Sequence, residues 1–303
     1  MSEPAIQSDV AVLDSDDVAA ENRTEAGPRL AVRSFGLTDK GQVRPKNEDQ
    51  FLIATLLKSL RAEQTSLRVP PLLHSGDQCH LFIVADGMGG HAGGEEASAL
   101  AIDSVESFVL DTFRWFAQFK GKEEDRVLKD FQTALGLANA RLLAEGAERP
   151  ELQGMATTLT LAYSQNDRLF VAHAGDTRCY LFRDRRLHRL TSDHTLVEEM
   201  VRYGALQAEQ VPAHQWRHVV TNAVGGHHSE IKVEVHKLQL APEDEILLCS
   251  DGLTNMVSDE EIARILAAEP EPKNACRQLV GHANDAGGKD NITVVIACYD
   301  SVS

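Results

Sequence analysis

The sequence predicts an α+β fold in which antiparallel β-sheets are flanked by helices. Three observations support this fold class. Apolar, β-rich runs and helical patterns come in blocks along the 303 residues, without strict β-α-β alternation. Two long amphipathic patterns follow a glycine-rich turn. Several short strand patterns, separated by turn residues, come next.

The first 30 residues differ from the rest of the chain. They are polar and acidic, contain no aromatic residue and show no sustained apolar periodicity. Such a composition cannot bury enough apolar surface to fold on its own. We therefore predict a disordered acidic tail over residues 1–30 and one folded domain over residues 31–303.

Three strands are predicted next. The runs LAVRSFGL, FLIATLL and HLFIVAD are apolar and β-rich, and the third ends in the turn DGMGGHAGG. Residues 56–78 separate the second run from the third by more than a tight hairpin needs, so we predict a loop there. After the turn, apolar side chains recur at helical spacing over residues 97–109 and 127–142, which indicates two long helices.

The second half of the chain returns to short strands. TTLTLAY, RLFVAHA, TRCYLFR and RLHRL are separated by turn residues, which is typical of an antiparallel meander. A short helical pattern over residues 197–203 and an irregular stretch to about residue 230 follow. IKVEVHKLQL, EILLCSDG and NITVVIACY then predict strands, and helices are expected from about Ser258 and Pro272.

Composition and charge exclude several functional classes. The net charge of −16 argues against duplex nucleic acid or an anionic membrane surface as the main partner. No stretch approaches the roughly 18 consecutive apolar residues of a membrane helix, and the N-terminus lacks a signal-peptide pattern, so we expect a cytoplasmic protein. The five cysteines form no C-x-x-C pair, which argues against a disulfide or zinc framework.

Four short segments place an aspartate next to an apolar strand. They are NED at 47–49, DGMGG at 86–90, SDG at 250–252 and KDN at 289–291. Each segment alone is compatible with an ordinary turn. Converging carboxylates repel one another unless a cation neutralises them, and hard oxygen ligands suit Mg²⁺ or Mn²⁺. Together, the four segments indicate a divalent metal site.

Longer segments around these aspartates resemble one known family. GLTDKGQVRPKNEDQFLIA, LFIVADGMGGHAGGEEAS, GMATTLTLAY, FVAHAGDTRCYLFR, LTSDHT, LLCSDGLTNMVSDEEI and GGKDNITVVI are similar, in the same order, to the metal-dependent serine/threonine phosphatases of type 2C, the PPM family, in its bacterial form. The similarity runs from about Ser34 to Tyr299. It implies a four-layer αββα sandwich with a two-metal centre in a cleft at one end.

The resemblance also implies roles for individual residues. Asp86 would bridge two Mn²⁺ or Mg²⁺ ions, Arg44 would bind the substrate phosphate, and Asp176 would help to hold a weaker third ion. Two cations can lower the pKa of a shared water and stabilise an in-line displacement, so no protein nucleophile is needed. The other ligands, direct or through water, would be Glu48, Asp49, the Gly87 main-chain carbonyl, Asp251 and Asp290.

Two positions depart from the pattern of other family members. Met88 stands where animal members have a histidine proposed to protonate the leaving group, and metal-bound water or His91 could take that role. Asn255 stands where some relatives carry an aspartate, which would weaken the third metal site.

Residues 193–226 match the family's variable flap beside the active site. Trp216 in the flap could face the substrate or anchor the flap by packing. Four histidines in or near the flap have no standard zinc spacing, so we expect exposed loop residues there: His214, His218, His227 and His228.

The resemblance predicts a phosphatase that hydrolyses phosphoserine and phosphothreonine by attack of a metal-activated water. Its partners would be phosphorylated proteins and a counteracting serine/threonine kinase, and we expect a monomer. Two alternatives remain open, a catalytically silent scaffold that binds phosphoproteins and a phosphatase that acts on small molecules. The carboxylates and Arg44 are all present, which favours an enzyme over the scaffold.

Overall fold

The computed structural model describes residues 30–61, 72–89, 93–111, 122–227 and 229–302. The predicted acidic tail lies outside these residues, apart from its last member, and stays a prediction. His91 and His228 also lie outside the described residues. In the part of the chain that is described, no helix combines the length and the apolar character needed to cross a membrane.

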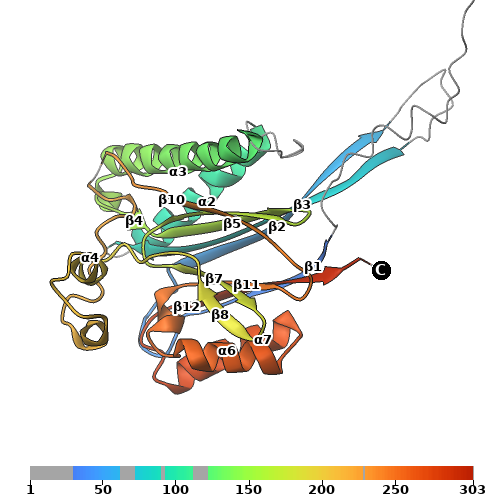
Figure 1. Ribbon diagram of the computed structural model, residues 1–303. Coiled ribbons are helices and arrows are strands. Elements are labelled where there is room, and N and C mark those ends of the chain that lie inside the picture. Colours follow the sequence, from blue (N-terminus) through green and yellow to red (C-terminus); the bar gives the residue numbers. More distant parts are fainter. Residues whose placement is uncertain (1–29, 62–71, 90–92, 112–121, 228, 303) are drawn as a thin grey trace, which may run out of the picture.

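Two antiparallel β-sheets form the centre of the molecule (Figure 1). The β12 sheet has the order β1-β12-β11-β7-β8. The β3 sheet has the order β10-β6-β5-β3-β4-β9, with β2 paired to β3. The strands are β1 Leu30–Asp39, β2 Asp49–Arg61, β3 Leu72–Met88, β4 Ala156–Thr157, β5 Leu159–Gln165, β6 Arg168–Ala174, β7 Arg178–Arg183, β8 Arg186–Arg189, β9 Val224–Gly225, β10 Glu234–Gln239, β11 Glu245–Cys249 and β12 Ile292–Ser301.

Helices cover both outer faces of the sheet pair. Figure 1 shows α2 and α3 against the β3 sheet, and α6 and α7 against the β12 sheet. This arrangement confirms the predicted four-layer αββα sandwich. The helices are α2 Gly93–Asp111, α3 Lys122–Glu148, η1 Pro150–Leu152, α4 Leu196–Arg202, η2 Ala208–Ala213, α5 Asp251–Thr254, α6 Asp259–Ala268 and α7 Pro272–Asp285.

Alternating side chains of β12 show how the layers are held together. Val294 and Ile296 pack against the helices, in the cluster that contains α6 and α7. Val295, Ala297 and Tyr299 pack between the two sheets. Successive side chains of a strand point to opposite faces, so a strand that is covered on both faces is apolar throughout. The run NITVVIACY therefore belongs to a central strand.

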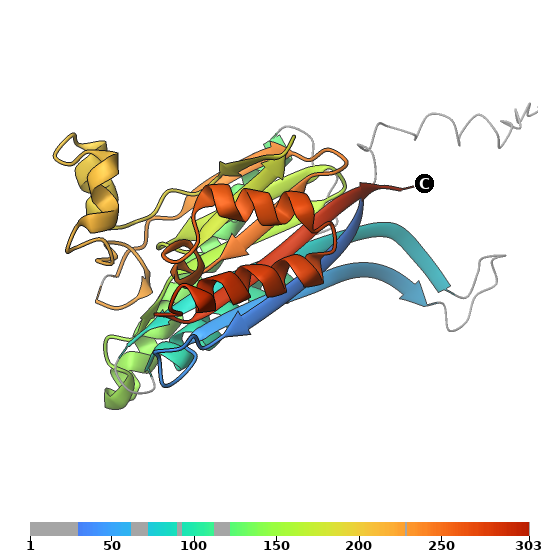
Figure 2. The ribbon, with the colours of Figure 1, turned by 90° about the horizontal axis from the view of Figure 1, so that it is seen from below.

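The prediction of a loop over residues 56–78 is wrong for residues 56–61 and 72–78, which belong to β2 and β3, whereas residues 62–71 lie outside the described residues. The β2–β3 ladder continues through the pairs Leu56↔Cys79 and Leu57↔Gln78, and after a register shift it resumes at Ser59↔His74. The two strands form a ribbon that projects beyond the sandwich (Figures 1 and 2). Hydrogen bonds between two strands can extend past the buried core, and a pattern of core-facing residues cannot reveal this.

The predicted single meander is also wrong, because its four strands divide between the sheets. β5 and β6 belong to the β3 sheet, whereas β7 and β8 belong to the β12 sheet. The chain crosses between the sheets at Gly175, whose φ is +123°. A Cβ at this position would lie 2.3 Å from the Cβ of Thr158, so the crossing requires glycine. It places Asp176 between the ends of the two sheets.

Candidate metal centre

The aspartates of the four acidic segments lie at one end of the sandwich. Asp49 begins β2 and faces Asp86, its register partner near the end of β3. Asp251 follows β11 and Asp290 precedes β12, the neighbouring strand of the other sheet. The charges of Asp49, Asp251 and Asp290 all act on Asp86. The ends of both sheets therefore bring the four carboxylates into one cluster, called here the acidic cluster.

Asp49 is buried in this cluster, with only 2% of its surface exposed. Its Oδ2 accepts hydrogen bonds from Ser250 Oγ and Thr293 Oγ1, both at 2.7 Å. Its Oδ1 is buried and has no hydrogen-bond partner among the described residues. A buried oxygen without a partner is costly, and a hard divalent cation would satisfy it.

Asp251, like Asp49, has one carboxylate oxygen that accepts a hydrogen bond and one buried oxygen that does not. Its Oδ2 accepts a hydrogen bond from Asn255 Nδ2 at 2.9 Å, and its buried Oδ1 has no hydrogen-bond partner in the described part of the chain. Asn255 therefore supports Asp251 through a hydrogen bond. Two carboxylates of the cluster thus each keep one oxygen available for a cation.

Burial and mutual repulsion shift the protonation of the cluster. Burial raises the pKa of Asp49 to about 7 and that of Asp251 to about 6. Burial also raises the pKa values of Asp86 and Asp176 well above the usual range, and neighbouring carboxylates raise them further. Like charges in a buried site cannot all ionise without a neutralising partner. The donor set is therefore suited to divalent cations bound by oxygen.

Glu48 joins the cluster because two glycines allow close approach of the backbone. A Cβ at Gly94 would lie 2.7 Å from the carboxyl carbon of Glu48. A Cβ at Gly87 would lie 2.0 Å from the carbonyl oxygen of Gly94. The start of α2 therefore packs directly on the end of β3 that follows Asp86. Burial raises the pKa of Glu48, and the charge of Arg44 opposes this rise.

Arg44 reaches the acidic cluster from the loop between β1 and β2. Its Nη2 donates a hydrogen bond to Asp290 Oδ2 at 2.7 Å, and this bond raises the pKa of Arg44. The side chain is 52% exposed. A guanidinium has five N–H donors in a planar fork, so donors remain for two oxygens of a phosphate.

The sequence did not single out Asn291, which organises the Arg44 loop. Its Nδ2 donates to the carbonyl oxygens of Lys40 and Lys46 at 3.0 and 2.8 Å. Its Oδ1 accepts from Glu48 N at 2.8 Å. Asn291 directly precedes the buried part of β12, and an amide in this position of KDNITVVI could have indicated the role.

Asp176 lies in the crossing between the sheets and is 8% exposed. Asp251 is the carboxylate whose charge most raises its pKa, after the larger effect of burial. Asp176 therefore adjoins the acidic cluster on the side of Asp251, which is consistent with the predicted role at a third ion.

The predicted flap over residues 193–226 stands beside the acidic cluster. In Figure 1, α4 lies at the end of the sandwich opposite to the β2–β3 ribbon. His218 Nδ1 lies 3.9 Å from Asp251 Oδ2, which brings the flap to the site. Trp216 is half-exposed, and its ring packs edge-on against His214 with centroids 5.5 Å apart.

A second group of ligand-type side chains lies at the base of the flap. The candidate ligand atoms of His173, His194 and Glu234 all lie within 4.8 Å of one another. The sequence analysis did not single out this group, because its members come from β6, the start of the flap and β10. It is separate from the acidic cluster.

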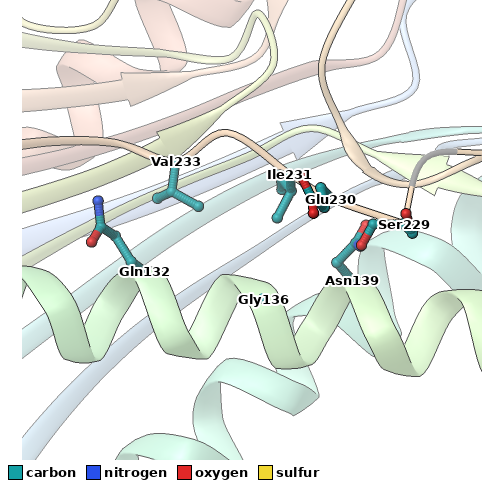
Figure 3. A pocket seen from close by; sticks show the side chains of 7 residues that line it. All are labelled: Gln132, Gly136, Asn139, Ser229, Glu230, Ile231 and Val233. Carbon is teal, nitrogen blue, oxygen red and sulfur yellow. The ribbon is translucent and has the colours of Figure 1, made fainter.

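Figure 3 shows a pocket on another part of the surface, between α3 and the chain before β10. Asn139 connects its two walls by donating to Ser229 O at 3.2 Å. No residue of the acidic cluster lines this pocket, so it is distinct from the candidate metal centre. Its lining residues are Gln132, Gly136, Asn139, Ser229, Glu230, Ile231 and Val233.

Comparisons with known proteins agree on one family. A family profile described as Protein phosphatase 2C matches residues 72–282. The serine/threonine protein phosphatase PstP of Mycobacterium tuberculosis is 33% identical over 268 residues, covering 88% of this chain and 45% of PstP. The serine/threonine phosphatase stp of Listeria monocytogenes is 30% identical over 263 residues, covering 87% of this chain and 94% of stp. The chain thus spans about half the length of PstP and nearly all of stp.

A solved structure shows the same architecture. The catalytic domain of the serine/threonine protein phosphatase PstP, in complex with two manganese ions, is similar with a TM-score of 0.70 at 32% identity. The match covers 89% of this chain and 99% of that chain. The profile covers more than half of the sequence, and both sequence relatives match most of it. The chain belongs to the protein phosphatase 2C family.

Proposed function

We propose that this chain is a protein phosphatase that hydrolyses phosphoserine and phosphothreonine with the help of bound divalent cations. The observation that carries the proposal is the acidic cluster, in which Asp49 and Asp251 each keep a buried oxygen without a hydrogen-bond partner among the described residues. Arg44 beside them is half-exposed and carries free donor capacity. The named activities of PstP and stp support the same class of reaction.

Two ions of Mn²⁺ or Mg²⁺ fit the residues that are present, and the PstP catalytic domain contains two manganese ions. When bound, the ions would supply a water of lowered pKa for attack on phosphorus and would neutralise charge on the phosphoryl oxygens. Asp176 would contribute to a weaker third ion. The residues proposed to hold the two ions, directly or through water, are Glu48, Asp49, Asp86, the Gly87 carbonyl, Asp251 and Asp290.

The protein's own side chains would position the reacting groups. Asp290 holds the guanidinium of Arg44 at the edge of the cluster, where its planar fork can bind two phosphate oxygens. Ser250 and Thr293 fix one oxygen of Asp49, so that the other has a defined direction. Met88, which follows Gly87 on β3, has no proton to donate to the leaving alkoxide.

Arg44 is half-exposed, so its guanidinium is accessible to a phosphorylated side chain on another protein. We therefore propose phosphoproteins as substrates and a serine/threonine kinase as the opposing enzyme. We also propose that the chain acts in the cytoplasm as a monomer.

Phosphate release from a phosphothreonine peptide tests the proposal, with Mn²⁺, with Mg²⁺ and with EDTA. Asp251→Asn removes the charge with little change in shape, and Asp103→Asn is a matched control, because Asp103 is exposed on α2 and paired with Arg141. Turnover is expected with either metal in the wild type and the control. It is expected to be lost in EDTA and in Asp251→Asn.

Two other results would favour the alternatives. No turnover with any metal, from folded protein that still binds Mn²⁺, would replace the enzyme with a phosphoprotein-binding scaffold. Turnover of small phosphate esters without turnover of any phosphopeptide would indicate a small-molecule phosphatase.

A further inference from the structure

The base of the flap contains a triad of side chains linked through Glu234, formed by His194, Glu234 and His236. His194 Nε2 lies 3.3 Å from Glu234 Oε2. Glu234 also accepts from His236 Nε2, through Oε1 at 2.6 Å. The ring of His173 packs on that of His194, with centroids 4.8 Å apart. His194 is therefore held between a carboxylate and a second imidazole.

The tautomer of His194 can be assigned from its partners. Nδ1 lies 3.1 Å from Gly175 N and 2.8 Å from Asn222 Nδ2, and both of these atoms are donors. The orientation of the Asn222 amide is fixed by Lys232, whose N–H donates to Oδ1 and whose carbonyl accepts from Nδ2. Nδ1 is therefore an acceptor, and the proton of the neutral ring lies on Nε2, where it is donated to Glu234.

This assignment argues against a metal ion at the triad. Nδ1 is occupied by two donors, one of which is a backbone N–H that cannot turn away. Nε2 needs its proton, so it has no lone pair for a cation. Burial lowers the pKa of His173 to about 4, so His173 is a neutral neighbour at physiological pH.

The main chain of His194 bonds both to the crossing at Gly175 and to the far side of the flap at Thr221. Its N donates to Gly175 O at 2.7 Å, which closes a two-point pairing with the residue before Asp176. Its O accepts from Thr221 N at 2.8 Å and from Thr221 Oγ1 at 3.1 Å, near the end of the flap. The entrance and exit of the flap are thus tied to the crossing that carries Asp176.

Asp193, the residue before His194, binds the C-terminal end of the same crossing at Arg178. Its carboxylate accepts from Nε and Nη2 of Arg178, the shorter bond being 2.7 Å. Asp193 and His194 therefore hold both ends of the segment from Gly175 to Arg178, called here the Asp176 loop. A displacement of His194 would move the loop and the flap together.

We propose that His194, oriented by Glu234, is a positioning residue that holds the flap and the Asp176 loop in the arrangement needed to bind a phosphoprotein substrate. This role rests on the phosphatase function proposed above. The side chain of His194 bonds to Gly175, Asn222 and Glu234, none of which belongs to the acidic cluster, so it would act through these residues. A small phosphate ester would make fewer contacts with the flap than a phosphoprotein does, so the effect should depend on the size of the substrate.

His194→Ala and His194→Asn test the proposal, with His188→Ala as the matched control because His188 is exposed on β8. Amide hydrogen exchange should become faster over residues 193–226 and over the Asp176 loop in His194→Ala, and should be unchanged in the control. The KM for a phosphothreonine peptide should rise about tenfold, while that for p-nitrophenyl phosphate stays within about twofold. His194→Asn should recover part of both effects, because its side-chain oxygen can replace Nδ1 as acceptor.

Three results would overturn the proposal. Unchanged hydrogen exchange in both segments would show that His194 does not connect them. An equal rise in KM for the phosphothreonine peptide and for p-nitrophenyl phosphate, without recovery in His194→Asn, would indicate a purely structural role. Stoichiometric Zn²⁺ binding that disappears in His194→Ala would make His194 a metal ligand. A wild-type protein without phosphatase activity would refute the proposed function, whereas hydrogen exchange would still decide whether His194 ties the segments together.

Discussion

His173 makes the stability of the protein sensitive to acid, and His173→Gln should remove this sensitivity. In the neutral ring, Nε2–H donates to Ser192 O at 3.1 Å, and Nδ1 pairs with Thr160 Oγ1 at 2.8 Å. A glutamine amide can still donate to the Ser192 carbonyl, and it does not titrate. The substitution therefore removes the ionisable group while one polar contact is kept.

The size of the effect follows from the shift in pKa. Burial lowers the pKa of His173 from 6.5 to about 4, while the charges of Glu234 and Asp193 oppose the shift. Between these two values the unfolded chain binds more protons, so stability is full above pH 6.5 and falls as the pH falls. The contribution of His173 should make the free energy of unfolding about 2 kcal/mol smaller at pH 5 than at pH 7.5.

Urea unfolding at pH 7.5 and pH 5.0, followed by circular dichroism in EDTA, measures this loss. The buried carboxylates titrate in the wild type and in His173→Gln alike, so the difference between the two proteins isolates His173. The loss on acidification should be smaller by about 2 kcal/mol in the variant. His188→Gln, at an exposed histidine of β8, should behave as the wild type. An equal loss in His173→Gln and the wild type would refute the assignment of a buried neutral His173.

Three further substitutions test the metal centre. Arg44→Lys should lower kcat/KM for a phosphothreonine peptide about 10- to 100-fold in steady-state kinetics, because an ammonium cannot bind two phosphate oxygens as a planar fork. Gly94→Ala should weaken Mn²⁺ binding about tenfold in titration calorimetry, since its Cβ would lie 2.7 Å from the carboxyl carbon of Glu48 and displace it. Asn255→Asp should lower stability in EDTA by about 1–3 kcal/mol, because a second carboxylate replaces the donor to Asp251, and Mn²⁺ should restore the melting temperature.

Matched controls separate these effects from general damage. Arg33→Lys changes an exposed arginine that pairs with Asp300. It lies near the end of β1 that is remote from Arg44, so this substitution should leave the kinetics unchanged. Gly281→Ala meets nothing within 4 Å and should leave Mn²⁺ binding unchanged. Wild-type kinetics in Arg44→Lys would exclude Arg44 from phosphate binding. Unchanged Mn²⁺ affinity in Gly94→Ala would exclude Glu48 as a ligand. A higher stability of Asn255→Asp in EDTA would contradict the hydrogen bond from Asn255 to Asp251.

The layers of the fold could be predicted because they depend on local patterns. Apolar side chains at helical spacing identify α2 and α3, and the uninterrupted apolar run of β12 identifies a strand covered on both faces. The positions of the acidic residues relative to these strands also lie in the sequence. Asp86 follows the apolar run LFIVA and Asp251 follows the run ILLCS, which is why the acidic cluster could be anticipated as a set of residues.

The connections between distant segments could not be predicted in the same way. Asn291 binds the carbonyl oxygens of Lys40 and Lys46, which are about 250 positions away, and no local pattern encodes that pairing. The crossing at Gly175 moves the chain from one sheet to the other, although the strands on both sides are alike in being buried almost throughout. His194 and Glu234 look unrelated in sequence, because only the flap brings them together.

The residues of the acidic cluster do not maximise the stability of the protein without bound metal ions. Asp49 belongs to the β3 sheet, whereas both of its hydrogen-bond donors, Ser250 and Thr293, come from the β12 sheet side of the sandwich. A neutral residue could join the sheets here without the cost of burying a charge. The carboxylate adds something only if a cation is present to take its second oxygen. The contact between the two sheets at Asp49 therefore lies where the proposed ions would bind. Binding of these ions would stabilise the folded state.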